Sequence, residues 1–272
     1  MSDAMSFAGK RIVITGAYSG IGAALVELLR DAGADHIVAL DIKEPEASVE
    51  HFIETDMGDP ASIDAAVAQI NAEGAAPVDL LFNNAGIAGT KAPDKVLRVN
   101  TLGLKRLTDS LLPTMKRGGA IINTASIAGN RWAERAEKIQ ELFSLPGWEE
   151  EVSWVIENPD TVGDGYSFSK ECVQVYTMST ARRATEHGLR INSVCPSPVD
   201  TPLLVDFRET ISDKIIDWAI DAGAGRVATA EDPAKALLFL ASDLASYVNG
   251  VNLIVDGGFG AALQSGQTAP PE

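Results

Sequence analysis

Residues 10–25 constrain the fold most, because they join a short apolar run to a glycine-rich turn and then to a helical pattern. Arg11 to Thr15 has the composition of a buried strand, and from Gly20 onward apolar residues recur on one side of a helix. The turn carries Gly16, Gly20 and Gly22, spaced Gly-x-x-x-Gly-x-Gly. Glycines at such a corner let the backbone approach a pyrophosphate, which binds at the helix N-terminus. This stretch predicts a sheet with a dinucleotide site.

The rest of the chain alternates between strand-like and helix-like patterns. Apolar runs typical of strands occur at Ile12–Ile14, Ile37–Leu40, Val78–Phe82, Ala120–Asn123, Arg190–Val194 and Val251–Val255. Such alternation predicts a Rossmann-type, doubly wound parallel sheet of about seven strands, with helices on both faces and ligands at the carboxyl ends of the strands. With 272 residues and no internal repeat, we expect a single dinucleotide-binding and catalytic domain over residues 1–272.

A carboxylate at the end of the second strand-like run bears on the choice of dinucleotide. Asp41 follows Gly22 by 19 residues, close to the roughly 20 expected for the acid that binds the adenosine ribose. It would accept hydrogen bonds from the ribose hydroxyls and repel a 2′-phosphate. Ser19 supplies no basic group for that phosphate, although Lys43 is near enough to leave NADP open. The sequence favours NAD.

Tyr166 and Lys170 stand four residues apart in a helical pattern. Residues at this spacing face the same way, so the ammonium lies near the phenol. A nearby positive charge favours the phenolate, and we expect Lys170 to lower the pKa of Tyr166 from about 10 toward 7, which needs roughly 4 kcal/mol. One lysine supplies part of this, and a cationic nicotinamide is expected to supply the rest.

With these features in order, the chain closely resembles the short-chain dehydrogenase/reductase family from about Gly9 to Gly260. The motifs that carry the resemblance are Thr15-Gly-Ala-Tyr-Ser-Gly-Ile-Gly22, Asp56, Asn83-Asn-Ala-Gly86, Asn100, Ser126, Tyr166-x-x-x-Lys170 and Pro196-Ser-Pro-Val-Asp-Thr201. Ser197 stands where the family usually has glycine, and we expect a local backbone adjustment without loss of activity.

The resemblance implies a role for each matched residue. Tyr166 is the acid/base, Lys170 lowers its pKa and binds the nicotinamide ribose, Ser126 binds the substrate oxygen, and Asn100 holds a water in a proton relay. The implied cofactor-binding residues are Gly16, Ser19, Gly20, Ile21, Gly22, Asp41, Asp56, Met57, Asn83, Ala85, Gly86, Tyr166, Lys170, Pro196, Val199 and Thr201. An alcohol would give its hydroxyl proton to Tyr166 while the cofactor takes a hydride.

The gap of 40 residues between Ser126 and Tyr166 exceeds the dozen or so usual in the family, which indicates an insertion at about residues 130–160. It carries Trp132, Trp148 and Trp154, and its patterns predict a helix over Ala133–Phe143 and a second one over Glu149–Glu157. The tryptophans either pack the insertion onto the domain or a subunit interface, or form a lid that contacts the substrate.

An insertion at this place, with the C-terminal stretch Ala245–Gly258, most resembles the 3α-hydroxysteroid dehydrogenase/carbonyl reductase branch of the family. That branch implies NAD and a bulky apolar alcohol or ketone as substrate. The insertion also flanks the helices that many family members use to form tetramers. We therefore expect a homodimer or a homotetramer, with the dimer as the hypothesis that the insertion favours.

The net charge of −16 argues against nucleic acid or an anionic membrane as a partner. The N-terminus lacks a signal pattern and no apolar stretch approaches 18 residues, so a cytoplasmic protein is expected. Cys172 and Cys195 are too few for a disulfide framework, and three scattered histidines predict no metal site. The polar tail at residues 262–272 is expected to be flexible.

Three functions remain open. The first is an NAD-dependent oxidoreductase of a bulky apolar secondary alcohol, such as a hydroxysteroid, a terpenoid or a lignin-type aromatic. The second is a reductase of small or carrier-bound 3-oxoacyl substrates, which Asp41 and the apolar insertion disfavour. The third is a non-catalytic NAD sensor, which has no use for Asn100, Ser126, Tyr166 and Lys170 together.

Overall fold

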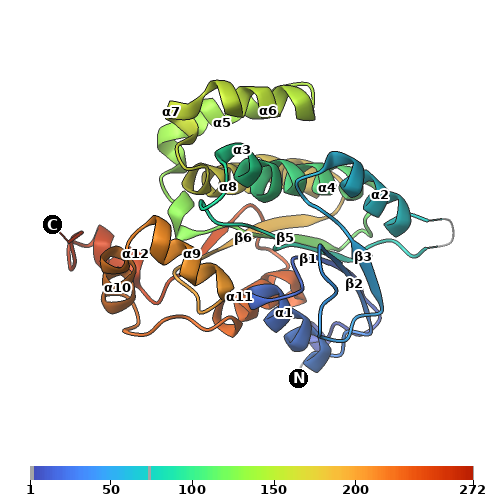
Figure 1. Ribbon diagram of the computed structural model, residues 1–272. Helices are drawn as coiled ribbons and strands as arrows, with labels where there is room; N and C mark the ends of the chain where they lie inside the picture. Colours follow the sequence, from blue (N-terminus) through green and yellow to red (C-terminus); the bar gives the residue numbers. More distant parts are fainter. Residues whose placement is uncertain (1–2, 73–74, 272) are drawn as a thin grey trace.

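The computed structural model describes residues 3–72 and 75–271, and over these residues the chain forms one seven-stranded parallel sheet (Figure 1). The strands are β1 Arg11–Thr15, β2 His36–Asp41, β3 His51–Glu54, β4 Leu80–Asn83, β5 Ala120–Thr124, β6 Arg190–Pro196 and β7 Asn252–Val255. Their order across the sheet is β3-β2-β1-β4-β5-β6-β7. The predicted doubly wound parallel sheet is confirmed.

The strand order reverses its direction of travel at β1, which lies between β2 and β4. At the carboxyl end of β1, Thr15 is level with Leu40 on one side and with Asn83 on the other. Connections that leave neighbouring strands toward opposite faces open a crevice at such a switch point, and ligands bind there in open α/β sheets.

Helices cover both faces of the sheet. The helices are α1 Gly20–Asp31, α2 Pro60–Ile70, α3 Pro93–Leu97, α4 Leu104–Leu111, α5 Ala136–Phe143, α6 Trp148–Glu157, α7 Pro159–Val162, α8 Tyr166–Glu186, α9 Pro202–Thr210, α10 Asp213–Ala222, α11 Glu231–Ala241 and α12 Phe259–Gln264. In Figure 1, α2, α4 and α8 lie on one side of the sheet, and α1 and α11 lie on the other.

Alternate side chains of the buried strands supply the two halves of the core. Val13, Leu81 and Ile121 pack with residues of α2, α4 and α8, whereas Ile14 and Phe82 pack with residues of α1 and α11. Every residue of β1 is buried, as expected for a parallel strand covered on both faces. This rigid centre holds the ends of the strands, where the sequence motifs lie.

The insertion forms its own small layer of helices. In Figure 1, α5, α6 and α7 lie beyond α3 and α8, on the side away from the sheet. The predicted helices agree with a 3₁₀ turn at Trp132–Arg135 followed by α5, and with α6, whereas α7 was not predicted. Trp154 is buried and stacks on Phe168 of α8 with ring centroids 6.1 Å apart, so this layer has an apolar core of its own.

Part of the C-terminal tail forms a helix and contacts α10. Residues Phe259–Gln264 form α12, and the indole N–H of Trp218 in α10 donates to Thr268 Oγ1 at 2.8 Å. Glu272, the last residue of the predicted flexible tail, lies outside the described residues. The helices α9, α10 and α12 gather beside the carboxyl end of β6, where they border the functional cleft.

Candidate active site

A cleft of about 1110 Å³ crosses the carboxyl ends of the strands on either side of the switch point. It is lined by Gly16, Ser19, Gly20, Ile21, Asp41, Asp56, Met57, Ala85, Gly86, Ser126, Tyr166, Lys170, Pro196, Val199 and Thr201 among the residues that the sequence singles out. Segments far apart in the chain therefore meet in one cleft. Gly22, Asn83 and Asn100 do not line it, and neither do the three tryptophans of the insertion.

The glycine-rich turn folds tightly against the loop that follows β4. Gly16 has a φ of +70°, and a Cβ atom there would lie 2.7 Å from the Cα atom of Ala85. A Cβ atom at Gly22 would lie 1.9 Å from the carbonyl oxygen of Gly16, so this glycine permits the turn to close and does not face the cleft. Gly22 thus supports the loop from beneath, which corrects its expected direct contact with the cofactor.

Asp41 lies at the end of β2, beside the glycine-rich turn. Its Oδ2 accepts a hydrogen bond from the backbone N–H of Tyr18 at 3.0 Å, and its Oδ1 accepts one from the N–H of Ile42 at 2.7 Å. These bonds fix the carboxylate at one end of the cleft. Lys43 also lines the cleft, with Nζ 5.2 Å from the ring centroid of Tyr18.

The two asparagines after β4 have different environments. The side chain of Asn83 is buried and donates from Nδ2 to Thr108 Oγ1 and Asn123 Oδ1 at 2.9 and 2.8 Å. Asn84 lines the cleft and donates from Nδ2 to the carbonyl oxygen of Gly16 at 3.0 Å. Asn83 therefore braces neighbouring elements, and Asn84, which the sequence analysis left unassigned within its motif, holds the glycine-rich turn.

Asn100 lies in a six-residue π-helical turn, Arg98–Gly103, and is almost fully buried. Its Oδ1 accepts from the N–H of Ile87 at 2.8 Å, and its Nδ2 donates to the carbonyl oxygen of Ile87 and to Ser169 Oγ at 3.0 and 3.1 Å. Single π-helical turns are frequent at functional sites. Here Asn100 links Ile87, in the loop after β4, to Ser169 of α8, which directly precedes Lys170.

Tyr166 begins α8 and meets Ser126, which follows β5. Ser126 lies close enough to the phenol to favour the phenolate, but burial acts more strongly and raises the pKa of Tyr166 to about 12. The expected lowering of this pKa by Lys170 is therefore wrong for the protein alone. The physical reason is that water is excluded from the phenol, which penalises its charged form.

Lys170 is itself buried, in the same helix as Tyr166. Burial lowers the pKa of Lys170 to about 8, and its Nζ donates to the carbonyl oxygen of Thr124 at 3.0 Å. The Nζ atom lies 5.8 Å from the ring centroid of Tyr166. The ammonium is thus near the ring while its hydrogen bond points to β5.

An apolar wall that the sequence analysis missed closes the end of the cleft beside Tyr166. Its members are Phe207 of α9, Ile211 just after that helix, Ile215 and Trp218 of α10, and Phe259 of α12. The ring of Phe207 packs on the ring of Tyr166 with centroids 4.7 Å apart. The four-residue spacing of Phe207, Ile211 and Ile215 after the Pro196–Thr201 motif was the available signal.

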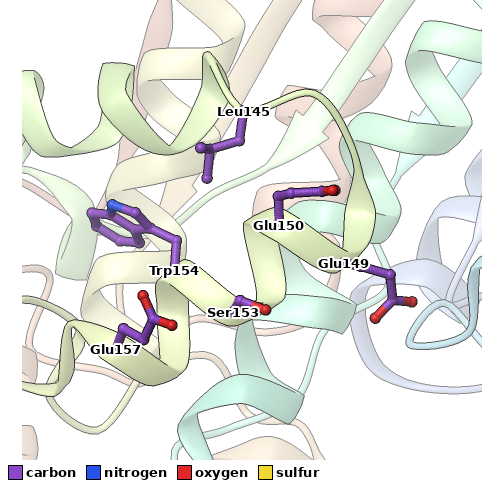
Figure 2. Close-up of a pocket in the computed structure, with 6 residues that line it drawn as sticks. All are labelled: Leu145, Glu149, Glu150, Ser153, Trp154 and Glu157. Carbon is purple, nitrogen blue, oxygen red and sulfur yellow. The ribbon is translucent and has the colours of Figure 1, made fainter.

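The tryptophans of the insertion lie elsewhere, which corrects their expected contact with the substrate. Trp148 and Trp154 are buried among the helices, and only Arg131 of residues 130–160 lines the cleft. Figure 2 shows a separate, smaller pocket of about 270 Å³ on α6, in which Trp154 and Leu145 lie beside Glu149, Glu150, Ser153 and Glu157. The tryptophans therefore form no lid over the cleft in this structure.

The residues of the cleft fit a dinucleotide. Close packing at Gly16 brings the backbone of the turn before α1 against the loop after β4, and the N-terminus of this helix attracts phosphate. A Cβ atom at Gly86 would lie 3.5 Å from Lys170 Nζ and 3.4 Å from Asn100 Oδ1, so this glycine keeps space open beside the lysine. A carboxylate suited to a ribose stands at one end, and the Ser126–Tyr166 pair stands at the other.

Two protein-family models match this chain, and together they cover most of it. The model described as short chain dehydrogenase matches residues 10–136, and the model described as enoyl-(acyl carrier protein) reductase matches residues 157–260. Residues 137–156, which include most of α5 and α6, lie between the two matches. This uncovered segment lies within residues 130–160, the expected insertion.

The alignments with individual relatives cover nearly all of this chain and nearly all of each relative. The chain is 33% identical over 258 residues to a coniferyl-alcohol dehydrogenase of Pseudomonas sp. strain HR199, covering 93% of this chain and 98% of the relative. It is 32% identical to a galactitol 2-dehydrogenase of Rhizobium johnstonii, covering 92% and 95%. The crystal structure of a 3α-hydroxysteroid dehydrogenase from Pseudomonas sp. B-0831 with NADH matches with a TM-score of 0.78 at 28% identity, covering 96% and 100%.

No helix within residues 3–72 and 75–271 has the length and apolar character needed to cross a membrane.

Proposed function

Because this chain belongs to the short-chain dehydrogenase/reductase family and is an oxidoreductase of the alcohol dehydrogenase type, we propose that it interconverts a bulky apolar secondary alcohol and its ketone with NAD as cofactor. The observation that carries this proposal is that Ser126 and Tyr166 line the same cleft, where Phe207 and its apolar neighbours pack beside the phenol. The polar pair supplies the chemistry, and the apolar wall selects the substrate.

The proton is handled by Tyr166. With a pKa of about 12, its hydroxyl is protonated near neutral pH and is ready to donate to a carbonyl oxygen. Ser126 shares that oxygen and fixes its distance from the phenol. In the reverse direction Tyr166 accepts the hydroxyl proton of the alcohol, which any positive charge placed beside the phenol assists. A bound nicotinamide dinucleotide supplies the hydride acceptor or donor.

The wall of the cleft points to the class of substrate. Phe207, Ile211, Ile215, Trp218 and Phe259 present apolar groups beside Tyr166, and apolar walls with few polar groups suit bulky apolar ligands. The relatives named for coniferyl alcohol and for a 3α-hydroxysteroid support a ring-bearing alcohol, whereas the relative named for galactitol shows that family membership alone does not select it. We infer a hydroxysteroid-like, terpenoid or aromatic alcohol.

Asp41 supports NAD over NADP. Its carboxylate is held in place by three backbone N–H groups, those of Tyr18, Ile42 and Lys43. A fixed negative charge at the ribose end of the cleft suits two free hydroxyls and repels a phosphate. Lys43 stands nearby but lies over the ring of Tyr18.

A reductase of small or carrier-bound 3-oxoacyl substrates is the alternative, and the description of one family model bears on carrier-bound substrates. The family model that matches residues 157–260 is described as an enoyl-(acyl carrier protein) reductase. That segment includes Tyr166 and the whole apolar wall. These residues suit both reactions, so they do not distinguish one from the other. The substrate and cofactor panel below distinguishes them.

The insertion also bears on assembly, and we propose a homodimer. Helix α6 contacts α3 and α5 contacts α8, so the inserted layer covers part of the outer face of the helices on this side of the sheet. A face covered by the chain's own helices is not available to a second subunit. Light scattering that gives the mass of a tetramer would contradict this assignment.

The test of the activity is a spectrophotometric assay of 3α- and 3β-hydroxysteroids, monocyclic terpenols, aryl carbinols and 3-oxoacyl thioesters, each with NAD(H) and NADP(H). We expect turnover of at least one ring-bearing alcohol with NAD, and loss of that turnover in Tyr166→Phe with NADH binding retained. Turnover of only the thioesters with NADPH would establish the alternative, and substantial activity in Tyr166→Phe would place the acid/base elsewhere.

A further inference from the structure

Asp164 lies two residues before Tyr166, shortly after the insertion. It lies in the connection between α7 and α8, flanked by Gly163 and Gly165, which have φ values of +59° and +84°. The Oδ1 atom of Asp164 accepts a hydrogen bond from the backbone N–H of Tyr166 at 3.0 Å. The carboxylate therefore holds the first residue of the helix that carries the acid/base.

The helix needs this acceptor because its N-cap residue is Gly165, which has no side chain to offer. The first N–H groups of a helix have no partner within the helix and require one from outside. Gly165 itself is dictated by packing, since a Cβ atom there would lie 2.9 Å from the Cα atom of Pro93. Asp164 thus replaces a cap that the crowded backbone excludes.

The same carboxylate lies against the loop that follows β4. A Cβ atom at Gly89 would lie 3.2 Å from Oδ2 of Asp164 and 3.4 Å from its Cγ. Asp164 therefore fits between this loop and the start of α8. Its position depends on both segments, and a change in its side chain acts at the junction between them.

The charged groups around the Tyr166 phenol are few. Along α8 the neighbour is Lys170, and before the helix it is Asp164, whose negative charge adds to burial in raising the pKa of Tyr166. The loop after β5 contributes Ser126 and α9 contributes Phe207, neither of which carries charge. Asp164 consequently opposes formation of the phenolate, the species that Lys170 favours.

We propose that Asp164 is a positioning residue for the reaction: through the Tyr166 N–H it fixes the start of α8, and with it the Tyr166 phenol, and it places a carboxylate next to the first turn of that helix. This inference rests on the proposed function, in which Tyr166 is the acid/base. It assigns the short connection after the insertion a part in the proton transfer, although the insertion's tryptophans do not line the cleft.

Two substitutions separate the hydrogen bond from the charge. Asp164→Asn retains an oxygen that accepts from the Tyr166 N–H and removes the charge, whereas Asp164→Ala removes both. Asp160→Asn, which neutralises another exposed carboxylate in α7 of the same segment, is the matched control. Circular dichroism and thermal melting of the full chain identify any variant that fails to fold.

The first readout is ultraviolet titration of tyrosinate in the protein alone, taken as the difference between each Asp164 or Asp160 variant and the same variant with Tyr166→Phe. We expect Asp164→Asn to move the Tyr166 titration down by about 0.5 pH unit at low salt, and by less at high salt, because the carboxylate is exposed. This readout does not depend on turnover, so it stands apart from the choice of substrate.

The second readout is the pH profile of kcat/KM with the best alcohol of the panel. Asp164→Asn is expected to shift the midpoint of this profile downward and to keep the plateau value of kcat/KM within about threefold of the unsubstituted enzyme. Asp164→Ala is expected to have a kcat about tenfold lower than that of Asp164→Asn, with little change in KM for NAD. An unshifted titration in Asp164→Asn, or an equal shift in Asp160→Asn, would overturn the inference. Activity in Tyr166→Phe would instead refute the proposed function.

Discussion

The guanidinium of Arg135, in the insertion, makes two hydrogen bonds to the carboxylate of Glu171 in α8, with Nε–Oε2 and Nη2–Oε1 distances of 2.7 and 2.6 Å. The same guanidinium donates to the carbonyl oxygen of Thr161 at 2.6 Å. One side chain thus ties the beginning of the insertion to its end and to the helix that carries Tyr166 and Lys170. Glu171 is only 1% exposed, whereas Arg135 is 30% exposed.

Removal of this arginine is expected to destabilise the fold. Arg135→Ala leaves the Glu171 carboxylate buried without its partner, and we expect a loss of about 3–5 kcal/mol in the free energy of unfolding. Urea unfolding followed by circular dichroism measures it. Arg182→Ala, which breaks an exposed pair with Glu186 on the same helix, should cost no more than about 1 kcal/mol. Equal losses in the two variants would show that the buried pair has no special weight.

Lys170 is expected to cost stability at neutral pH. Its pKa in the folded protein is about 8 rather than 10.5, so between these values the unfolded chain binds more protons and stability rises with pH. The full cost is present below pH 8. Lys170→Met should therefore raise the unfolding free energy at pH 7 by about 2 kcal/mol, after allowance for the lost bond to Thr124, while abolishing turnover.

Denaturant unfolding at pH 7 and at pH 10.5 measures this difference between Lys170→Met and the natural protein, and we expect the gain to disappear at the higher pH. Lys235→Met is the control, because this lysine is 58% exposed in its pair with Glu231. A gain in stability that is the same at both pH values would rule out the buried ammonium as its cause.

Asp41 is expected to set the cofactor preference. Asp41→Asn retains one acceptor oxygen, which the N–H of Ile42 can keep, but loses the oxygen that accepts from Tyr18 together with the charge that repels a 2′-phosphate. We expect the ratio of kcat/KM for NADP to that for NAD to rise at least about tenfold. Glu44→Gln, an exposed carboxylate three residues away, should leave the ratio unchanged. An unaltered ratio in Asp41→Asn would show that this carboxylate does not set the preference for NAD over NADP.

Phe207 is expected to select ring-bearing substrates. Because its ring packs on Tyr166 at 4.7 Å, Phe207→Ala removes apolar surface beside the reacting oxygen, and we expect kcat/KM for a steroid or aryl carbinol to fall about tenfold. A short aliphatic alcohol should be affected much less. Val205→Ala, on the same helix but 72% exposed, should change neither value. Equal losses for large and small alcohols would mean that Phe207 supports Tyr166 and does not select the substrate.

Trp154 is expected to act on stability and not on substrate binding. Trp154→Phe removes the hydrogen bond from the indole N–H to Glu141 Oε1 and part of the stack on Phe168, which should cost about 1–2 kcal/mol of unfolding free energy. Steady-state kinetics should give an unchanged KM for every alcohol in the panel. A raised KM specific to bulky alcohols would restore the insertion as a lid.

The sequence alone determined the sheet, its direction and the dinucleotide crevice, together with a minority of the residues that line it, among them Tyr166 and Lys170. The reason is that these features rest on local chemistry: apolar strand runs, a glycine-rich corner before a helix, and polar residues at strand ends. Two helices of the insertion, α5 and α6, also followed from its periodicity, because their apolar faces repeat along the chain.

Only the tertiary structure decided what surrounds each of these residues. Burial by segments distant in sequence reverses the expected shift in the pKa of Tyr166, since excluding water penalises the phenolate more than Ser126 stabilises it. Packing places Asn83 against Thr108, and it places Phe207 rather than the tryptophans of the insertion beside Tyr166. Solvent exclusion and side-chain packing depend on the assembled fold, and no motif spacing encodes them.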